Sequence, residues 1–479
     1  MLYSRRCNVF AASAGRTAGL CDKNTYVRLV LAVLVFGIGL AQAAAAPAPQ
    51  FKKGDSVAVI GDSITHGGKY QAFLYLFYAT RFPDREIKMY NCGISGDSAS
   101  GACRRFEWDI EVHKPTAATV LLGMNDVGRS LYGKDKTDAK SKKAQADALA
   151  GYTANMAKLA ELLKKAKVRT TFLTPTVYEQ NADTGSENFF GCNEGLANCG
   201  KEAGKIAKKF HYAVIDLHAL MNDVNEKGQK EDPKFTIVGK DRVHPGDVGH
   251  FIMAYAILKG QKAPEYVSKM AVNAETRKAE EENCKISDLK AAKEEVSFTC
   301  LENALPYPVP EAAKDALKLV PFEKEMNQEI LKVDGLAPGT YELQIDGEAV
   351  GEYPADDLKA GVNLASNVNT PQYKQALQVA ELNEKRHGLE SGRLRSIACV
   401  QHGMLNKVKV DLNDMEALTK TLNESLEKMK NTPYYAYNKA MVDNYLKYKP
   451  EEKQTIQEIE QAMTSMYEVN QPKPHNFVI

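Results

Sequence analysis

Four short blocks of the sequence contain residue types that can carry out acyl transfer. They are Gly61-Asp62-Ser63-Ile64, Asn91-Cys92-Gly93-Ile94-Ser95-Gly96-Asp97, Gly123-Met124-Asn125-Asp126 and Asp241-Arg242-Val243-His244-Pro245. A serine hydroxyl becomes an effective nucleophile when a base removes its proton, and histidine is that base near neutral pH. We therefore take Ser63 as the candidate nucleophile and His244 as the candidate base.

The other groups that this chemistry needs are present in the same blocks. The histidine needs an acid at its second nitrogen, and Asp241 precedes His244 by three residues, near enough for one loop to present both. A tetrahedral intermediate needs hydrogen-bond donors for its oxyanion. The backbone N–H groups of Ser63 and Gly96 and the side-chain amide of Asn125 are the candidate donors. Such a reaction requires no metal and no organic cofactor.

An alternation of strands and helices from residue 56 to about 260 can position these blocks. The expected strands are 56–61, 86–93, 118–123, 169–174 and 213–217, with helices through 70–78, 149–163 and 247–258. Repeated β-α units predict a parallel sheet with helices on both faces. Ligands of such sheets bind at the carboxyl ends of the strands, where the first three blocks fall. We therefore expect the blocks to converge on one crevice.

In order and approximate spacing, the four blocks resemble those of the SGNH hydrolases, the GDSL esterase/lipase superfamily, over about residues 54–262. That family uses a Ser, a Gly, an Asn and a His, which correspond here to Ser63, Gly96, Asn125 and His244. The resemblance implies a flavodoxin-like three-layer α/β/α sandwich. It also implies a serine esterase that works through an acyl-enzyme intermediate, of the bacterial secreted type with a C-terminal extension. Such members often act on acetylated carbohydrates, so we expect short acyl groups on a glycan as substrate.

Some alternatives to this interpretation concern single residues and some concern the whole function. The α/β-hydrolase fold requires Gly-x-Ser-x-Gly, and Thr65 occupies the second glycine position, so we exclude that fold. Within the SGNH pattern, Ile64 replaces the usual Leu. His66 and His250 flank the site, and we interpret them as packing residues. A non-catalytic carbohydrate-binding or scaffold protein on the same fold is the alternative function.

The first 46 residues have the features of a targeting segment. A basic start precedes an apolar run from Leu29 to Leu40 and a small-x-small site at 41–43. This pattern is typical of a cleaved secretory signal. A membrane anchor is the alternative, because residues 29–46 carry no charge. We expect a secreted or periplasmic protein with no stable membrane span after cleavage.

The length of 479 residues predicts more than one domain. The net charge of +1 does not indicate the excess of basic residues that is typical of nucleic-acid-binding proteins. We expect the hydrolase domain over 47–262 and a C-terminal region over 263–479. That region is predicted to be mostly helical, with a small antiparallel β meander at about 330–353. We interpret the charged segment 275–283 as a solvated helical face. The role of the C-terminal region and the oligomeric state stay open.

Seven cysteines follow the predicted signal. In an oxidising compartment, close pairs are disulfide candidates, and the alternative for each pair is reduced cysteine. Zinc is not expected, because no pair has Cys-x-x-Cys spacing. The pairs are Cys192 with Cys199, which is the best candidate, then Cys284 with Cys300 and Cys92 with Cys103, leaving Cys399 as a buried thiol.

Overall fold

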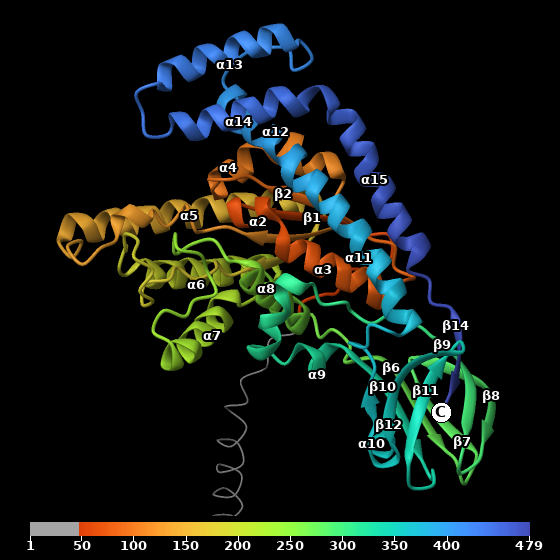
Figure 1. Ribbon diagram of the computed structural model, residues 1–479. Coiled ribbons are helices and arrows are strands. Elements are labelled where there is room, and N and C mark those ends of the chain that lie inside the picture. The colour runs from red at the N-terminus through yellow and green to blue at the C-terminus, as the bar shows by residue number, and fades with distance from the viewer. Residues whose placement is uncertain (1–46) are drawn as a thin grey trace, which may run out of the picture. The chain divides into compact units, whose positions relative to one another are not determined.

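A five-stranded parallel sheet carries the four blocks in the computed structural model, which describes residues 47–479 (Figure 1). Its strands are β1 (Ser56–Gly61), β2 (Lys88–Gly93), β3 (Ala117–Leu121), β4 (Arg169–Leu173) and β5 (Ala213–Ile215). All neighbouring strands pair in parallel, in the order β2-β1-β3-β4-β5. This is the flavodoxin-like order, so the predicted fold class is confirmed.

Helices cover both faces of this sheet. On one face lie α3 (Lys69–Arg81), α7 (Leu217–Glu231) and α8 (Asp247–Gly260), and on the other α4 (Ala99–Arg104), α5 (Ala139–Lys165) and α6 (Cys192–Phe210). Along β1, Val57 and Val59 enter the first core, whereas Ala58 and Ile60 enter the second. Burial on both faces explains why this strand is a continuous apolar run.

A short helix, α2 (Ser63–Gly67), follows β1 directly and was not predicted. Two glycines allow it to lie close against the ends of β1 and β2. A Cβ atom on Gly61 would lie 2.0 Å from Oγ1 of Thr65, and one on Gly93 would lie 2.2 Å from the backbone nitrogen of His66. Any larger residue at either position would therefore push α2, and Ser63 with it, away from the edge of the sheet.

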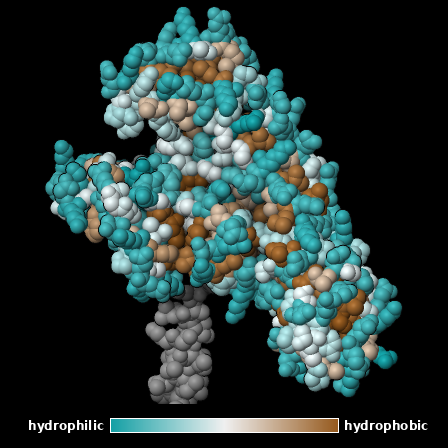
Figure 2. Space-filling model, viewed as in Figure 1, coloured by the Kyte–Doolittle hydropathy of each residue, from teal (hydrophilic) through white to brown (hydrophobic). Residues whose placement is uncertain are grey.

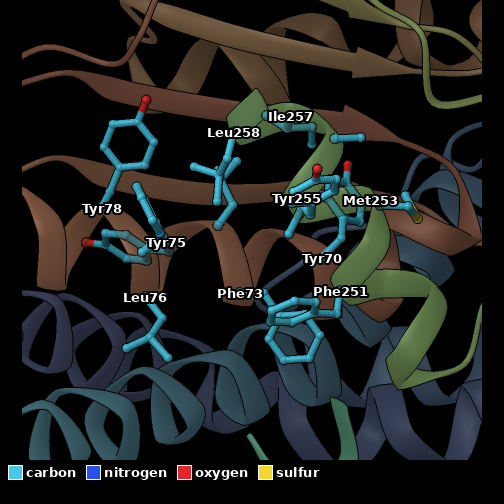
Figure 3. Close-up of a cluster of buried hydrophobic side chains, with 14 of the residues drawn as sticks. Tyr70, Phe73, Tyr75, Leu76, Tyr78, Phe251, Met253, Tyr255, Ile257 and Leu258 are labelled. Carbon is cyan, nitrogen blue, oxygen red and sulfur yellow. The ribbon is translucent and has the colours of Figure 1, made fainter. Parts of the chain in front are cut away.

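Aromatic side chains dominate the core between the sheet and the C-terminal region. Figure 3 shows Phe73 of α3 facing Phe251 of α8, and their ring centroids lie 5.7 Å apart. Phe251 also contacts Tyr307 and Phe322, with centroids at 6.1 and 5.0 Å. Residues from beyond position 262 thus belong to the same core as the parallel sheet, and Pro47–Ile479 form one compact unit.

Two further sheets enclose a separate core in the C-terminal region. Their orders are β13-β10-β6-β7 and β12-β11-β14-β9-β8. The strands are β6 (Tyr266–Asn273), β7 (Lys278–Glu282), β8 (Cys284–Ala291), β9 (Val296–Glu302), β10 (Gln328–Asp334), β11 (Thr340–Ile345), β12 (Glu348–Pro354), β13 (Val362–Asn363) and β14 (Pro474–Val478). The last strand, β14, lies between β11 and β9, so the chain returns to this region at its end.

The antiparallel strands predicted at about 330–353 are present, but they belong to two sheets. β10 pairs in parallel with β6 and antiparallel with β13, whereas β11 and β12 form a hairpin in the other sheet. The prediction of a helix at 275–283 is wrong, because Lys278–Glu282 is the edge strand β7. All five residues of β7 are exposed, and charged residues are a common protection of sheet edges.

Helices form the rest of the C-terminal region, as predicted. They are α9 (Phe322–Met326), α10 (Ala355–Ala360), α11 (Pro371–Leu389), α12 (Arg395–Val400), α13 (Met415–Met429), α14 (Tyr435–Tyr448) and α15 (Glu452–Val469). α11 packs on α3 and on α15, which adds a further layer to one face of the sandwich (Figure 1). α12, α13 and α14 share a small core, and Figure 2 shows hydrophobic residues at the surface over α13 and α14.

The predicted disulfides are not formed. All seven cysteines in the described residues have free thiols. Cys192 and Cys199 both lie on α6, seven residues apart, which corresponds to about 10.5 Å along a helix axis. A disulfide requires Cα atoms within about 7 Å, so a continuous helix excludes this pair.

The aromatic core predicts a large cost for removing Phe251. We expect Phe251→Ala to lower the free energy of unfolding by about 3–5 kcal/mol, because the ring is almost fully buried among aromatic neighbours from both parts of the chain. Denaturant titration of the full chain measures this change. Phe190 is 43% exposed, and Phe190→Ala should change the stability by less than about 1 kcal/mol. Equal losses in the two variants would contradict the shared core.

Candidate active site

The structure brings Ser63, His244 and Asp241 together at the end of β1. The Oγ atom of Ser63 lies 2.7 Å from Nε2 of His244, although the two residues are 181 positions apart in sequence. On the other side of the ring, Nδ1–H of His244 donates to Oδ2 of Asp241 at 2.5 Å. With its proton on Nδ1, the ring presents Nε2 as the acceptor for the Ser63 hydroxyl. This is the arrangement that activates a serine nucleophile.

Asp241 organises its own loop in addition to the imidazole. Its Oδ1 atom accepts the backbone N–H groups of Val243 at 3.1 Å and His244 at 3.0 Å. Partial burial raises the pKa of this carboxyl, but the hydrogen bonds from the His244 side chain and from the two N–H groups lower it further. The net pKa is below the ordinary value. Asp241 is therefore ionised at neutral pH and can stabilise a positively charged imidazole.

Arg242 anchors the catalytic loop, a role that the sequence did not reveal. Its backbone is left-handed, with φ of +66°, and its side chain is buried. The guanidinium donates at 2.9–3.2 Å to four backbone carbonyls, those of Glu179, Ala182, Ser186 and Glu187. Because its partners are carbonyls more than 50 residues away, no pattern of residue types could have indicated this contact.

The predicted oxyanion donors lie on neighbouring loops. Gly96 has φ of +77°, a conformation that favours glycine. Within residues 47–479, the N–H groups of Ser63 and Gly96 have no protein acceptor. The Asn125 side chain donates to the backbone oxygen of Asp97 at 2.8 Å, which ties the loop after β3 to the loop that contains Gly96. The role of these three groups as oxyanion donors stays a prediction.

The C-terminal helices hold the same edge of the sheet. At the end of α11, Glu390 accepts the backbone N–H of Asn91 on β2 at 2.8 Å. The next residue, Ser391, donates its hydroxyl to the backbone oxygen of His66 on α2 at 2.8 Å. The helix that carries Ser63 is therefore held in place by Ser391, 325 positions from its partner His66, and the neighbouring strand β2 by Glu390.

A buried network of charges joins the Gly96 loop to α12. Arg105 donates to Asp97 at 2.7 Å and also to Asp109, and Arg395 of α12 donates to Asp109 at 2.8 Å. Nε2 of His402 lies 3.3 Å from Asp97. Burial raises the pKa of both aspartates, but these partners lower it more, and both carboxyls end with a pKa below the ordinary value. The loop between β2 and α4 is thus fixed by ionised groups.

The structure supports the interpretation of His66 and His250 as packing residues. Desolvation lowers the pKa of His66 to about 4, and the positive charge of Arg395 contributes. Desolvation also lowers the pKa of His250 to about 3. His66 Nδ1 lies 3.2 Å from Oγ of Ser95, and the ring of His250 stacks on Tyr70. Both rings are therefore neutral near pH 7, with His250 buried and His66 partly exposed.

Asp62 forms the N-cap of α2. Its Oδ1 atom accepts the backbone N–H of Ile64 at 3.0 Å, and the side chain is almost completely buried. Desolvation raises the pKa of this carboxyl to about 7, and the nearby charge of Asp126 adds to the rise. The residue next to the nucleophile is therefore a carboxyl that changes its charge near neutral pH.

Comparison with known proteins identifies the family of this chain. Residues 57–257 match the family model GDSL-like Lipase/Acylhydrolase. The acetylxylan esterase of Geobacillus stearothermophilus is 26% identical over 221 residues, which cover 43% of this chain and 93% of that protein. A gut microbial diltiazem-metabolizing enzyme of known structure is 32% identical, with a TM-score of 0.82, over 91% of this chain and 99% of the other. The chain belongs to the SGNH hydrolase superfamily and is an esterase.

The raised pKa of Asp62 predicts a pH-dependent stability. Through most of the range from pH 5 to 7.5, the Asp62 carboxyl is ionised in the unfolded state but largely protonated in the folded state. The free energy of unfolding of the wild-type protein therefore falls as the pH rises. Asn keeps the capping oxygen but does not titrate. We therefore expect the stability of Asp62→Asn relative to wild type to increase by about 2 kcal/mol over this range.

Denaturant titrations of both proteins at several pH values measure this difference. Asp138 is the exposed N-cap of α5, and hydrogen bonds from Ser141 lower its pKa. Asp138→Asn is the matched control, for which the relative stability should stay constant over this range, because a carboxyl with a lowered pKa is ionised in both the folded and the unfolded state there. A flat difference for Asp62→Asn would show that the buried carboxyl does not titrate in this range.

Proposed function

We propose that the protein hydrolyses carboxylic esters through an acyl-enzyme formed on Ser63. The observation that supports this most directly is the continuous hydrogen-bonded chain from Ser63 Oγ through His244 to Asp241. His244 removes the hydroxyl proton as Oγ attacks the ester carbonyl carbon, and the carboxylate of Asp241 stabilises the resulting imidazolium. The alcohol then leaves with the proton held by His244.

The negative charge that develops on the carbonyl oxygen is stabilised by hydrogen-bond donors. We assign this role to the N–H groups of Ser63 and Gly96 and to the side-chain amide of Asn125. One such donor contributes about 3–4 kcal/mol to lowering the barrier. In the second half of the reaction, water takes the place of the alcohol, His244 activates it, and the attack on the acyl-enzyme releases the acid and restores the Ser63 hydroxyl.

Short acyl groups on carbohydrate are the proposed substrate class. The similarity to an acetylxylan esterase, which covers 93% of that protein, supports this proposal. We further propose that residues 47–262 form the hydrolase domain, with 263–479 as a C-terminal region. The proposed site of action is outside the cytoplasm, in the secreted or periplasmic fraction, after removal of residues 1–46, which lie outside the described residues.

Replacement of the nucleophile tests the mechanism. We expect Ser63→Ala to lower kcat for acetate release from acetylated xylo-oligosaccharides and from 4-nitrophenyl acetate by at least about 10⁴-fold, since the acyl-enzyme can no longer form. Asp241→Asn should lower kcat by a similar order, because it favours the wrong tautomer of His244. Ser287→Ala, at an exposed position on β8, is the control and should keep the full rate.

Covalent labelling separates this mechanism from a non-catalytic role. A fluorophosphonate probe should label the wild-type protein and the Ser287→Ala variant but not Ser63→Ala. Equal esterase rates in wild type and Ser63→Ala, or labelling that does not depend on Ser63, would overturn the assignment.

A further inference from the structure

A cleft opens between the Gly96 loop and the segment that follows α12. Its volume is about 600 Å³. Residues 95–98 and Arg104 line one wall, and residues of the 402–407 segment line the other. Figure 1 shows α4, which ends at Arg104, beneath α12 and α14. Gly96 lies both in this wall and among the proposed oxyanion donors, so the cleft adjoins the proposed catalytic site.

The cleft has an excess of positive charge. Asp97 is the one carboxylate in its lining, and that group is already engaged by Arg105 and His402. Arg104 and Lys407, from opposite walls, form no salt bridge with any acidic residue among residues 47–479. Arg104 instead donates to the hydroxyl of Ser100 at 2.8 Å. Two exposed cations therefore face this space without a counter-ion from the protein.

The chemistry of the lining indicates how a ligand would be recognised. No Phe, Tyr or Trp side chain lines the cleft, so recognition there depends mainly on polar and charged groups. A guanidinium presents paired N–H donors that match the geometry of a carboxylate, and an ammonium adds charge without a fixed direction. Asn406 and the hydroxyls of Ser95 and Ser98 supply further polar groups of the kind that bind sugar hydroxyls.

We propose that this cleft is a subsite for a carboxylate on the alcohol part of the ester, which makes O-acylated uronic acids the preferred substrates. The proposal rests on the proposed esterase function, in which the acyl group is short and the alcohol is the larger part. Arg104 and Lys407 bind the carboxylate, while the scissile ester reaches Ser63 past Gly96. The C-terminal region thereby selects the substrate.

A matched pair of substrates tests this subsite in the full-length protein. One is the methyl glycoside of O-acetylated galacturonic acid, and the other is its neutral uronamide. We expect wild type to prefer the acid by about tenfold in kcat/KM, mainly through KM. Arg104→Gln and Lys407→Gln should each lower this ratio about threefold, and the double variant should abolish it. The ratio should also fall as salt is added.

Two surface variants control for a general loss of positive charge. Arg277 and Lys420 are exposed and form no salt bridge within the described part of the chain, so Arg277→Gln and Lys420→Gln should leave the ratio unchanged. Equal rates on acid and amide in wild type, or equal losses on both substrates in the variants, would overturn the subsite while leaving the esterase intact.

A binding measurement keeps the two proposals separate. Sodium galacturonate should bind the wild-type protein in a calorimetric titration and should bind the Arg104→Gln, Lys407→Gln double variant at least about fivefold more weakly. If 4-nitrophenyl acetate is not hydrolysed, the esterase proposal fails, and this titration still decides whether the cleft takes a carboxylate. Equal binding by wild type and the double variant would reject the subsite.

Discussion

The buried ion network between the sheet and α12 is the constraint on which the active-site loops depend. Arg105 is completely buried, and besides Asp97 and Asp109 it donates to the backbone oxygens of Gly61 and Cys92, at the ends of β1 and β2. One guanidinium therefore joins two strand ends and the loop that contains Gly96. A buried charge without its partner costs several kcal/mol, so these groups are stable only as a set.

This set is incomplete without the C-terminal region. Asp109 is shared between Arg105 and Arg395, and Arg395 also donates to the backbone oxygen of Gly93 at 2.9 Å. Removal of α12 would leave Asp109 with one cation instead of two and would expose the end of β2 to solvent. The region after residue 262 is therefore part of the architecture of the site, and the shared aromatic core around Phe251 leads to the same conclusion.

The correct predictions from the sequence concern residues whose chemical type and whose place in a predicted element indicate the same role. β1 and β3 are buried on both faces, so each appeared as a short apolar run, and Ser63 and Asn125 follow these two runs closely. The contact between Ser63 and His244 was predictable because few residue types can activate a serine. Arg242 and Arg395 were missed because they bind backbone carbonyls and buried acids that lie far away in sequence.

The errors have equally specific causes. Cys192 and Cys199 were considered a disulfide candidate because they are close in sequence, but the stretch that contains them forms α6. Gly195 is needed inside this helix because a Cβ atom there would lie 2.4 Å from the hydroxyl oxygen of Tyr132. A glycine that permits close packing and a glycine that breaks a helix have the same appearance in a sequence. Only the tertiary contact distinguishes these two kinds of glycine. Tertiary contacts likewise decide that the charged segment Lys278–Glu282 forms the edge strand β7 instead of a helix.

The two relatives cover different shares of this chain. The acetylxylan esterase aligns over 93% of its length with only 43% of this chain, so more than half of this chain has no counterpart in that protein. The diltiazem-metabolizing enzyme aligns over 91% of this chain and 99% of its own length. The Ser63–His244–Asp241 group lies wholly within residues 57–257, which match the family model. The C-terminal helices support the Gly96 loop and supply the wall that contains Lys407, to which we have assigned the proposed carboxylate subsite. In the proposed mechanism, the second wall of the cleft therefore selects the substrate of this protein, whereas the Ser63–His244–Asp241 group breaks the bond.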